Sequence, residues 1–426
     1  MRVRICALLI LALLLLSLPG CWGSRETDEV AYALALGFDK GEKDNLVVTV
    51  SIANPKVFAG MAGGGGGGGG GEGGKGTLVI STETYAPIAA IDLINTAVER
   101  RISLMHAKTY VFSEELAREG LNKWLTPLLR YRELRTTSLM VICRGKAKDF
   151  IEKNNPMLEL SPTKQFELIN KLSNEHGLYL NTQLLGFDEA LKSHSIQPSA
   201  PLVASHEGSL ESAKPGVNKG GEIALGKYLA GEVPISGGNK SQIIGTAVFR
   251  GDKMVGTLNG QETRDTMMLR GLFRNGIMAV TDPLAGDPTS LVGFIVHQAR
   301  SPEYKTSIDE NGNVSINVEI YLEPEIIGLF SGINYESPDL KPTLEEVFSR
   351  EVEQGCQNLI RRTQKELKSD IFGFGYQIKH HFWTVQPWRE MNWLGRYPDA
   401  QVNVSVHSTI RRTGLMSKTI PTVTGD

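Results

Sequence analysis

Histidine and cysteine are the residue types in this chain of 426 residues that could bind a metal ion. His380 and His381 are adjacent, but neighbours on a helix point in different directions and make a poor chelate. Beyond the N-terminal apolar run only Cys143 and Cys356 remain, too few for a four-ligand zinc site. We expect both to be buried and unpaired, because free cysteine behaves as a small hydrophobe. The sequence therefore predicts no metal and no cofactor.

Serine hydrolysis is the other chemistry for which the sequence offers a pattern. Three short motifs occur in the order found in penicillin-binding hydrolases: Ser161-Pro-Thr-Lys164, Ser315-Ile-Asn317 and Arg412-Thr413-Gly414. Pro162 is better explained as a first-turn proline behind an N-cap at Ser161, and Ser315 falls inside an expected strand. Motifs this short also arise by chance in a long chain. We therefore predict no catalytic residue, and a hydrolase is only the third hypothesis.

A glycine-rich segment at 59–76 resembles a phosphate-binding loop at first sight. A P-loop needs a lysine followed by Ser or Thr at the start of a helix. Here Lys75 is followed by Gly76 and then by the β-rich run TLVISTET. Because glycine has the most backbone entropy to lose, we expect 59–76 to be a flexible insertion in a β-hairpin.

Three tryptophans near the C-terminus, Trp383, Trp388 and Trp393, are spaced by five residues. They could form a surface that binds a partner, or they could pack around a C-terminal helix. We favour packing.

The elements that must position these residues follow a mixed pattern. Strand-like and helical runs alternate in the first half of the chain, and a hairpin is expected around Arg250–Lys253. The most regular helical pattern spans 343–369, where Thr343 and Glu346 are expected to form a capping box. We predict an N-terminal domain at 21–205, a Gly/Ser-rich linker at 206–222, a small middle α+β domain at 223–282 and a C-terminal α+β domain at 283–426.

Composition limits the classes of partner. The chain is 41% hydrophobic and 22% charged, as is typical of a soluble globular protein. A formal net charge of −2 argues against binding to nucleic acid. No polybasic block follows the N-terminal apolar run, so adhesion to anionic lipid by charge alone is not expected.

The N-terminus carries an apolar run, residues 5–19, behind two arginines. The run is shorter than the ~20 residues that cross a hydrocarbon core, and its cationic start and small terminal residues are typical of a signal peptide, placed at 1–20. Leu18-Pro19-Gly20-Cys21 resembles the bacterial lipobox. That resemblance implies cleavage between Gly20 and Cys21, with S-diacylglycerol and N-acyl (palmitate) chains on Cys21. The alternative is an uncleaved signal anchor.

Three blocks of sequence occur in a specific order: CWGSRE at 21–26, GTLNGQETRDTMMLRG at 256–271, and KSDIFGFG with IRRTG at 368–375 and 410–414. Together they resemble the Ger(x)C family, the lipoprotein C subunits of spore germinant receptors in endospore-forming bacteria. The resemblance covers nearly the whole chain and implies a three-domain α+β fold without enzymatic activity. It also implies a lipid anchor at Cys21 on the outer face of the spore's inner membrane.

By the same resemblance, the partners are two integral-membrane subunits, of A type and B type, with which the family senses amino acids, sugars or nucleosides. The leading hypothesis is therefore a non-enzymatic, lipid-anchored subunit of a germinant receptor that acts through contacts with membrane partners. The second is a lipid-anchored extracytoplasmic solute-binding protein that binds the germinant itself. A two-lobed body with one cleft between the lobes would favour the second.

Overall fold

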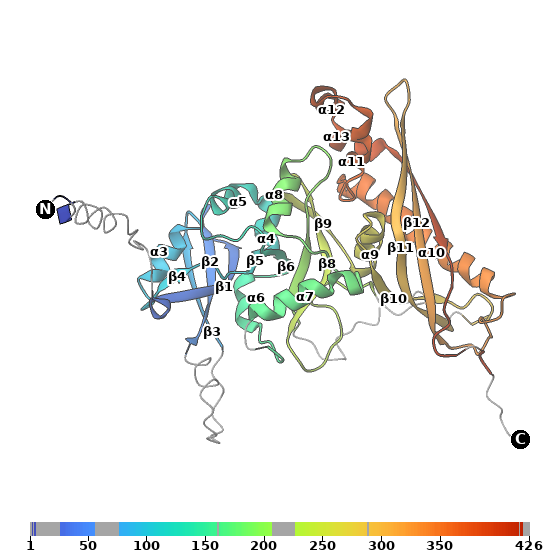
Figure 1. The fold of residues 1–426 in the computed structure, drawn as a ribbon, viewed down its shortest axis with the longest axis horizontal. Helices are drawn as coiled ribbons and strands as arrows, with labels where there is room; N and C mark the ends of the chain where they lie inside the picture. The colour runs from blue at the N-terminus through green and yellow to red at the C-terminus, as the bar shows by residue number, and fades with distance from the viewer. Residues whose placement is uncertain are drawn as a thin grey trace, which may run out of the picture.

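A computed structural model describes residues 2, 4–5, 26–55, 76–159, 162–206, 226–287, 289–416 and 418–420. Helices and strands are mixed throughout, and the strands form two separate sheets (Figure 1). The predicted α+β class is therefore confirmed. Within the described ranges, no helix combines the length and the apolar character needed to cross a membrane. Gly20 and Cys21 lie outside the described residues, as does nearly all of the predicted signal peptide.

The first sheet contains both antiparallel and parallel pairs. Its strand order is β3-β2-β1-β5-β6-β7-β8-β9, with β4 paired to β1. The four central strands, β1, β5, β6 and β7, are parallel to one another. The strands at both ends pair antiparallel, β3 with β2 and β2 with β1 at one end, and β7 with β8 and β8 with β9 at the other. The bounds are β1 (Val30–Lys40), β2 (Leu46–Ala53), β3 (Thr77–Thr84), β4 (Arg101–Ser103), β5 (Thr109–Ser113), β6 (Leu139–Cys143), β7 (Ser199–Ser205), β8 (Ser241–Arg250) and β9 (Lys253–Leu258).

Helices cover both faces of this sheet because its central strands are apolar on both sides. Along β5, Tyr110 and Phe112 enter one core and Val111 enters the other, as the two-residue period of a strand requires. One face is covered by α3 (Ala89–Asn95), α4 (Glu114–Glu119), α5 (Asn122–Leu129) and α8 (Leu184–Lys192), and the other by α6 (Ala147–Lys153) and α7 (Pro162–His176). A short turn, η1 (Thr27–Glu29), precedes β1.

The second sheet is buried on one face only. Its order is β10-β11-β12-β13, with bounds Asn275–Thr281, Leu291–Ile308, Val314–Leu329 and Gln401–Ser408. Buried residues alternate with more exposed ones along β12 and β13, which is the pattern of a half-covered sheet. The cover is α10 (Lys341–Arg362), whose buried residues recur at spacings of three and four. Asn311 and Gly312, a sequence typical of hairpin turns, lie in the turn that joins β11 to β12.

The helix α9 (Gly260–Leu269) connects β9 of the first sheet to β10 of the second. It packs against both β8 and α10, and most of its residues are buried. In Figure 1 it lies between the two sheets. After α10 the chain continues through η4 (Thr363–Leu367), α11 (Phe374–Ile378), η5 (Lys379–His381), α12 (Val385–Met391), α13 (Trp393–Arg396) and η6 (Tyr397–Asp399).

The predicted long helix is present as α10 followed by η4, but its predicted first residue and its predicted capping box are wrong. The long helix begins at Lys341, so Thr343 lies inside it, and Leu340 occupies the N-cap without a side-chain hydrogen bond. Pro342 in the first turn fits this earlier start, because proline is favoured there. A capping box does occur, but at Asn259 and Glu262, in front of α9.

The predicted hairpins are confirmed where the strands are described. β2 and β3 pair antiparallel, and the last bond before the glycine-rich segment joins Asn54 N–H to the Gly76 carbonyl. Residues 59–75 of that segment lie outside the described residues. Strands β8 and β9, which fall in the predicted middle domain, extend the first sheet. The division of the chain into three domains stays a prediction.

Candidate functional site

The residues of the serine-hydrolase pattern do not converge on one site. Ser315 and Asn317 lie near the start of β12, and the Asn317 side-chain oxygen accepts a hydrogen bond from Asn403. The carbonyl of Arg412 instead accepts from the Ile326 N–H near the far end of the same strand. Eleven residues of extended strand separate Ser315 from Ile326, about 36 Å. Ser161 lies outside the described residues.

The histidine pair and the two thiols are held in ordinary structural contacts. The Nε2 atom of His381 shares a hydrogen bond of 2.8 Å with the Thr306 hydroxyl, and His380 is exposed beside it. No cluster of three or more potential metal ligands occurs in the part of the chain that the structure describes. Cys143 and Cys356 are buried and unpaired, as predicted, and burial raises the pKa of both thiols.

The three tryptophans divide between packing and exposure. Trp388 and Trp393 are 3% and 1% exposed and belong to the core beneath the second sheet. Trp383 is fully exposed, and Tyr376 and Val385 in the same segment are about half exposed. Packing is therefore the answer for two of the three, and Trp383 is left as a surface feature.

The block at 368–375 forms a buried hydrogen-bonded turn around Asp370. Its carboxylate accepts hydrogen bonds from the backbone N–H groups of the residues that follow and from Trp393 Nε1, at 2.8 Å. The backbone donors are Phe372, Gly373, Phe374 and Gly375. Two of these positions require glycine. Gly373 has a φ of +78°, and a Cβ on Gly375 would come within 2.4 Å of the Trp393 ring.

The same turn ties the C-terminal part of the chain to the first sheet. The Ser369 hydroxyl donates to the Phe249 carbonyl on β8 at 2.6 Å. The Gln197 N–H, just before β7, donates to the Asp370 carbonyl at 2.7 Å. The Gln197 side chain in turn accepts from Gly251 N–H in the β8–β9 turn. The Asp370 turn therefore has a structural role at the junction of the two sheets.

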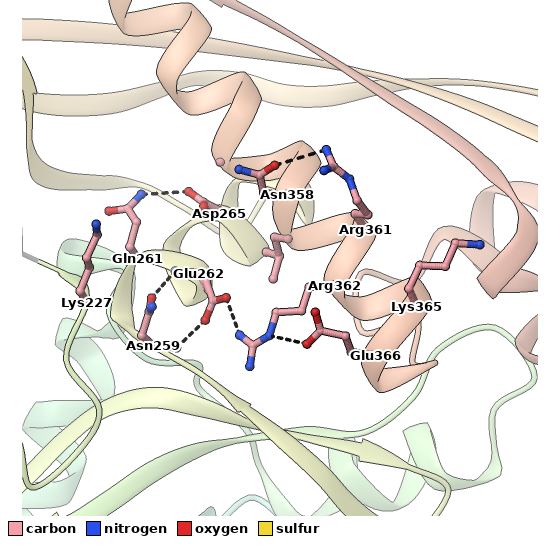
Figure 2. A pocket seen from close by; sticks show the side chains of 12 residues that line it. Lys227, Asn259, Gln261, Glu262, Asp265, Asn358, Arg361, Arg362, Lys365 and Glu366 are labelled. Atoms are coloured by element: carbon pink, nitrogen blue, oxygen red, sulfur yellow. Dashed lines mark hydrogen bonds and ion pairs between the residues drawn. The ribbon is translucent and has the colours of Figure 1, made fainter. Parts of the chain in front are cut away.

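A cavity of about 550 Å³ lies between α9 and the C-terminal half of α10. We call it the α9–α10 cleft (Figure 2). Its walls carry Gln261, Glu262 and Asp265 from α9 and Gly355, Asn358 and Arg362 from α10. Lys227, Arg361, Lys365 and Glu366 complete its charged residues. The cleft is therefore polar, with charges of both signs.

One wall of the cleft is closed by a network of ion pairs around Arg362. Its guanidinium is paired with Glu262, approaches Glu366 at 3.6 Å and donates to the Thr257 carbonyl at 2.9 Å. Glu262 also accepts from the Asn259 N–H in the capping box. The network joins the start of α9 to the end of α10, so both helices are held in place at the cleft.

The other notable wall residue is Asp265, which is only 3% exposed. Its Oδ1 atom accepts a hydrogen bond of 2.9 Å from Gln261 Nε2. Burial raises the pKa of Asp265 to about 7, and the Gln261 hydrogen bond and the Arg264 charge oppose that rise. Across the cleft, a Cβ on Gly355 would lie 3.1 Å from the Asp265 Oδ2 atom. A glycine at this position therefore allows the backbone of α10 to pack close to that oxygen.

Sequence reasoning did not single out the cleft. Its α9 residues fall in the block GTLNGQETRDTMMLRG. There Arg264 and Asp265 are charged residues in a helix whose residues are mostly buried, and both are buried themselves. Two consecutive charges on such a helix were the available signal. The opposing residues on α10 are about 90 positions further along the chain, and only the tertiary packing brings them together.

Two family models of spore germination proteins together match most of the chain. The family description "Spore germination protein N-terminal domain" matches residues 23–205, and "Spore germination B3/ GerAC like, C-terminal" matches residues 244–414. Spore germination protein KC of Bacillus subtilis (strain 168) is 26% identical, with 98% of each chain covered. Spore germination protein YndF of the same organism is 24% identical, with 96% of each chain covered.

A solved structure, described as the crystal structure of the GerBC protein, also matches. The TM-score is 0.46 and the sequence identity 17%, over 88% of this chain and 97% of that one.

Proposed function

Because the chain belongs to the Ger(x)C family of spore germination proteins, we propose that it is the non-enzymatic, lipid-anchored subunit of a germinant receptor. The observation that carries the proposal is that the two family matches together take in the body of the chain and include all but the first residues of its signature blocks. The Asp370 turn gives one of those blocks a structural role rather than a catalytic one.

The anchor is proposed at Cys21. The supporting observations are the cationic start, the 15-residue apolar run and the junction Gly20-Cys21, all read from the sequence. Two or three acyl chains hold a protein on a bilayer stably, whereas one chain holds it only marginally. The mature protein would then be tethered to the outer face of the spore's inner membrane.

The partners are proposed to be integral-membrane subunits of A type and B type. This proposal rests on the family resemblance, since the proteins named spore germination protein A3 and spore germination protein B3 are relatives of this chain itself. A candidate contact is the segment that exposes Trp383, with Tyr376 and Val385. Exposed apolar residues that gather in one segment are typical of interaction sites.

The proposal is tested by Cys21→Ala in spores. We expect the variant to move from the membrane fraction to the soluble fraction and to weaken the germination response. Cys6→Ala is the matched control, because Cys6 lies inside the apolar run and away from the junction; it should retain both properties. Normal membrane retention and normal germination of Cys21→Ala would contradict the proposed lipid anchor at Cys21.

The partner contact is tested separately, by co-purification from spore membranes followed by mass spectrometry. The wild-type chain should recover A-type and B-type subunits. Their absence from a preparation in which the chain itself is intact would contradict the receptor assembly while leaving the anchor unaffected.

One observation favours the second candidate, a protein that binds a solute directly. The α9–α10 cleft has a volume of about 550 Å³, and pockets for small molecules usually fall between about 300 and 1,000 Å³. The charges that line it indicate what kind of molecule would fit.

A further inference from the structure

The charges of the α9–α10 cleft are only partly compensated within the protein. Arg362 is neutralised by Glu262 and Glu366, so this trio presents no free cation to a ligand. Lys365 donates to the Pro398 carbonyl at 2.9 Å and faces Asp399 at 3.7 Å. Asp265 and Arg361 are the cleft residues that remain without an opposite charge at ion-pair distance, judged over the described ranges.

Asp265 is the acidic residue of the cleft without a cationic partner, and its carboxyl group is ionised above a pH of about 7. Only Gln261 donates a hydrogen bond to its carboxylate among the described residues, and that bond reaches Oδ1. The charge of the neighbouring Arg264 lowers the pKa of Asp265, but Arg264 donates no hydrogen bond to it, because its guanidinium donates to the His176 carbonyl and to Gln261 Oε1 instead. A buried carboxylate without a cation or a full set of donors is costly. The Oδ2 atom lies close to the backbone of Gly355, where a Cβ would come within 3.1 Å of it.

Arg361 is the uncompensated cation. Its Nη2 atom donates to Asn358 Oδ1 at 3.3 Å, and within the part of the chain that is described it has no ion pair. Figure 2 shows Asp265 of α9 close to Asn358 of α10, with Arg361 of α10 beyond Asn358. An acidic and a basic residue without ion-pair partners in the described ranges therefore line the same cleft, one from α9 and one from α10.

We propose that the α9–α10 cleft binds a small zwitterion, with its ammonium group on Asp265 and its carboxylate on Arg361. Ammonium–carboxylate and guanidinium–carboxylate contacts are charge-assisted and are about twice as strong as neutral hydrogen bonds. The ligand would supply to each residue the opposite charge that the protein itself does not. This inference goes beyond the lipid-anchored subunit proposed first, which needs no ligand, and it rests on the second candidate, for which it names the class of solute.

The test is binding to the full chain, purified in detergent, measured by isothermal titration calorimetry at pH 8, where the Asp265 carboxyl group is ionised. The probes are unbranched ω-amino acids from glycine to 6-aminohexanoate, and for each length the matching n-alkylamine and alkanoate. We expect one length of the ω-amino acid series to bind, and the amine and the carboxylate of that length to bind at least about tenfold more weakly. No binding of any ω-amino acid overturns the proposal.

The residues are tested with the probe that binds best. Asp265→Asn keeps the shape of the side chain and removes its charge, and Arg361→Gln removes the cation; each should weaken binding about tenfold or more. Arg350→Gln is the matched control for Arg361, because Arg350 lies on the same helix, outside the cleft and paired with Glu346. Asp44→Asn, at a highly exposed carboxylate, is the control for Asp265. Both controls should bind as the wild type does.

Equal affinity of Asp265→Asn, Arg361→Gln and wild type contradicts the assignment even if the probe binds. Should Asp265→Asn fail to fold, Arg361→Gln and the wild-type preference for the zwitterion over its amine and carboxylate halves decide the question. Because no membrane or spore is involved, failure here leaves the lipoprotein proposal untouched.

Discussion

At the scale of single residues, Asp265 is a buried carboxyl group in a helix most of whose residues are buried. Burial is the main reason that its pKa is raised to about 7, and the charge of Glu262 adds to the rise. The hydrogen bond from Gln261 and the charge of Arg264 act in the opposite direction without cancelling it. The folded protein therefore holds a proton at Asp265 at pH values where the unfolded chain has released it.

This shift fixes the sign of a pH effect on stability. Between pH ~4, where an unfolded aspartate titrates, and pH ~7, the folded state binds more protons, so the contribution of Asp265 to stability is lost as the pH rises. Asp265→Asn cannot ionise and escapes the loss. We compare the free energy of unfolding of the variant with that of the wild type at each pH. The variant should gain on the order of 2 kcal/mol relative to the wild type between pH 5 and pH 8.

The measurement is urea denaturation at pH 5 and pH 8. Asp44→Asn should follow the wild type at both values, because the Asp44 side chain is 94% exposed. An Asp265→Asn difference that is the same at both pH values would show that the carboxyl group is ionised throughout.

At the scale of elements, the hairpin of β2 and β3 carries the glycine-rich segment at its tip. The antiparallel ladder runs from Leu46–Thr84 to Ala53–Thr77 and ends with the Asn54–Gly76 bond. All residues of that ladder therefore lie outside 63–71, the central part of the glycine-rich segment.

Deletion of residues 63–71 should leave stability nearly unchanged. Shortening a loop alters its closure entropy only with the logarithm of its length, by well under ~1 kcal/mol here. Thermal unfolding of the deletion variant checks this, and a loss of more than ~5 °C in melting temperature would contradict it. As a control, Val48→Ala in the paired part of the same hairpin should be clearly destabilising, because Val48 is fully buried.

The elements also show what the sequence could and could not predict. The hairpins at Arg250–Lys253 and Asn311-Gly312 were predictable, because a turn signal between β-rich runs is local information. The start of α10 was missed because Thr343 and Glu346 have the spacing of a capping box, whereas the helix begins at Lys341 with Pro342 in its first turn.

The cleft could not be predicted at all from one sequence. Asp265 meets Gly355 only because α9 is packed against α10, and nothing in the local pattern of either helix encodes that pairing. The anchor is the opposite case, since its evidence lies entirely in the order of residues from Leu18 to Cys21.

At the scale of the whole molecule, the two sheets are joined by the main chain through α9 and, independently, by the Asp370 turn. Removing the Asp370 carboxylate would leave four backbone N–H groups and the Trp393 N–H buried without their acceptor. Buried donors without partners cost about 1–3 kcal/mol each before relaxation.

We therefore expect Asp370→Ala to lower the free energy of unfolding by at least about 3 kcal/mol. Asp399→Ala is the control, because Asp399 lies in the same C-terminal segment and its side chain is 88% exposed; it should change stability little. Thermal unfolding and hydrogen exchange at β7 and β8 are the measurements. Exchange at these strands unchanged in Asp370→Ala would show that the turn does not couple the two sheets.

The two connections between the sheets have a mechanical consequence. The segment that exposes Trp383 is continuous with α11, whose first residues donate to Asp370. Asp370 and Ser369 in turn bond to Gln197 and Phe249 at the far sheet. The segment around Trp383 is thus connected to the first sheet by these hydrogen bonds, in addition to the main-chain connection through α9. A displacement at Trp383 would therefore be transmitted to the first sheet, and the two sheets would move together.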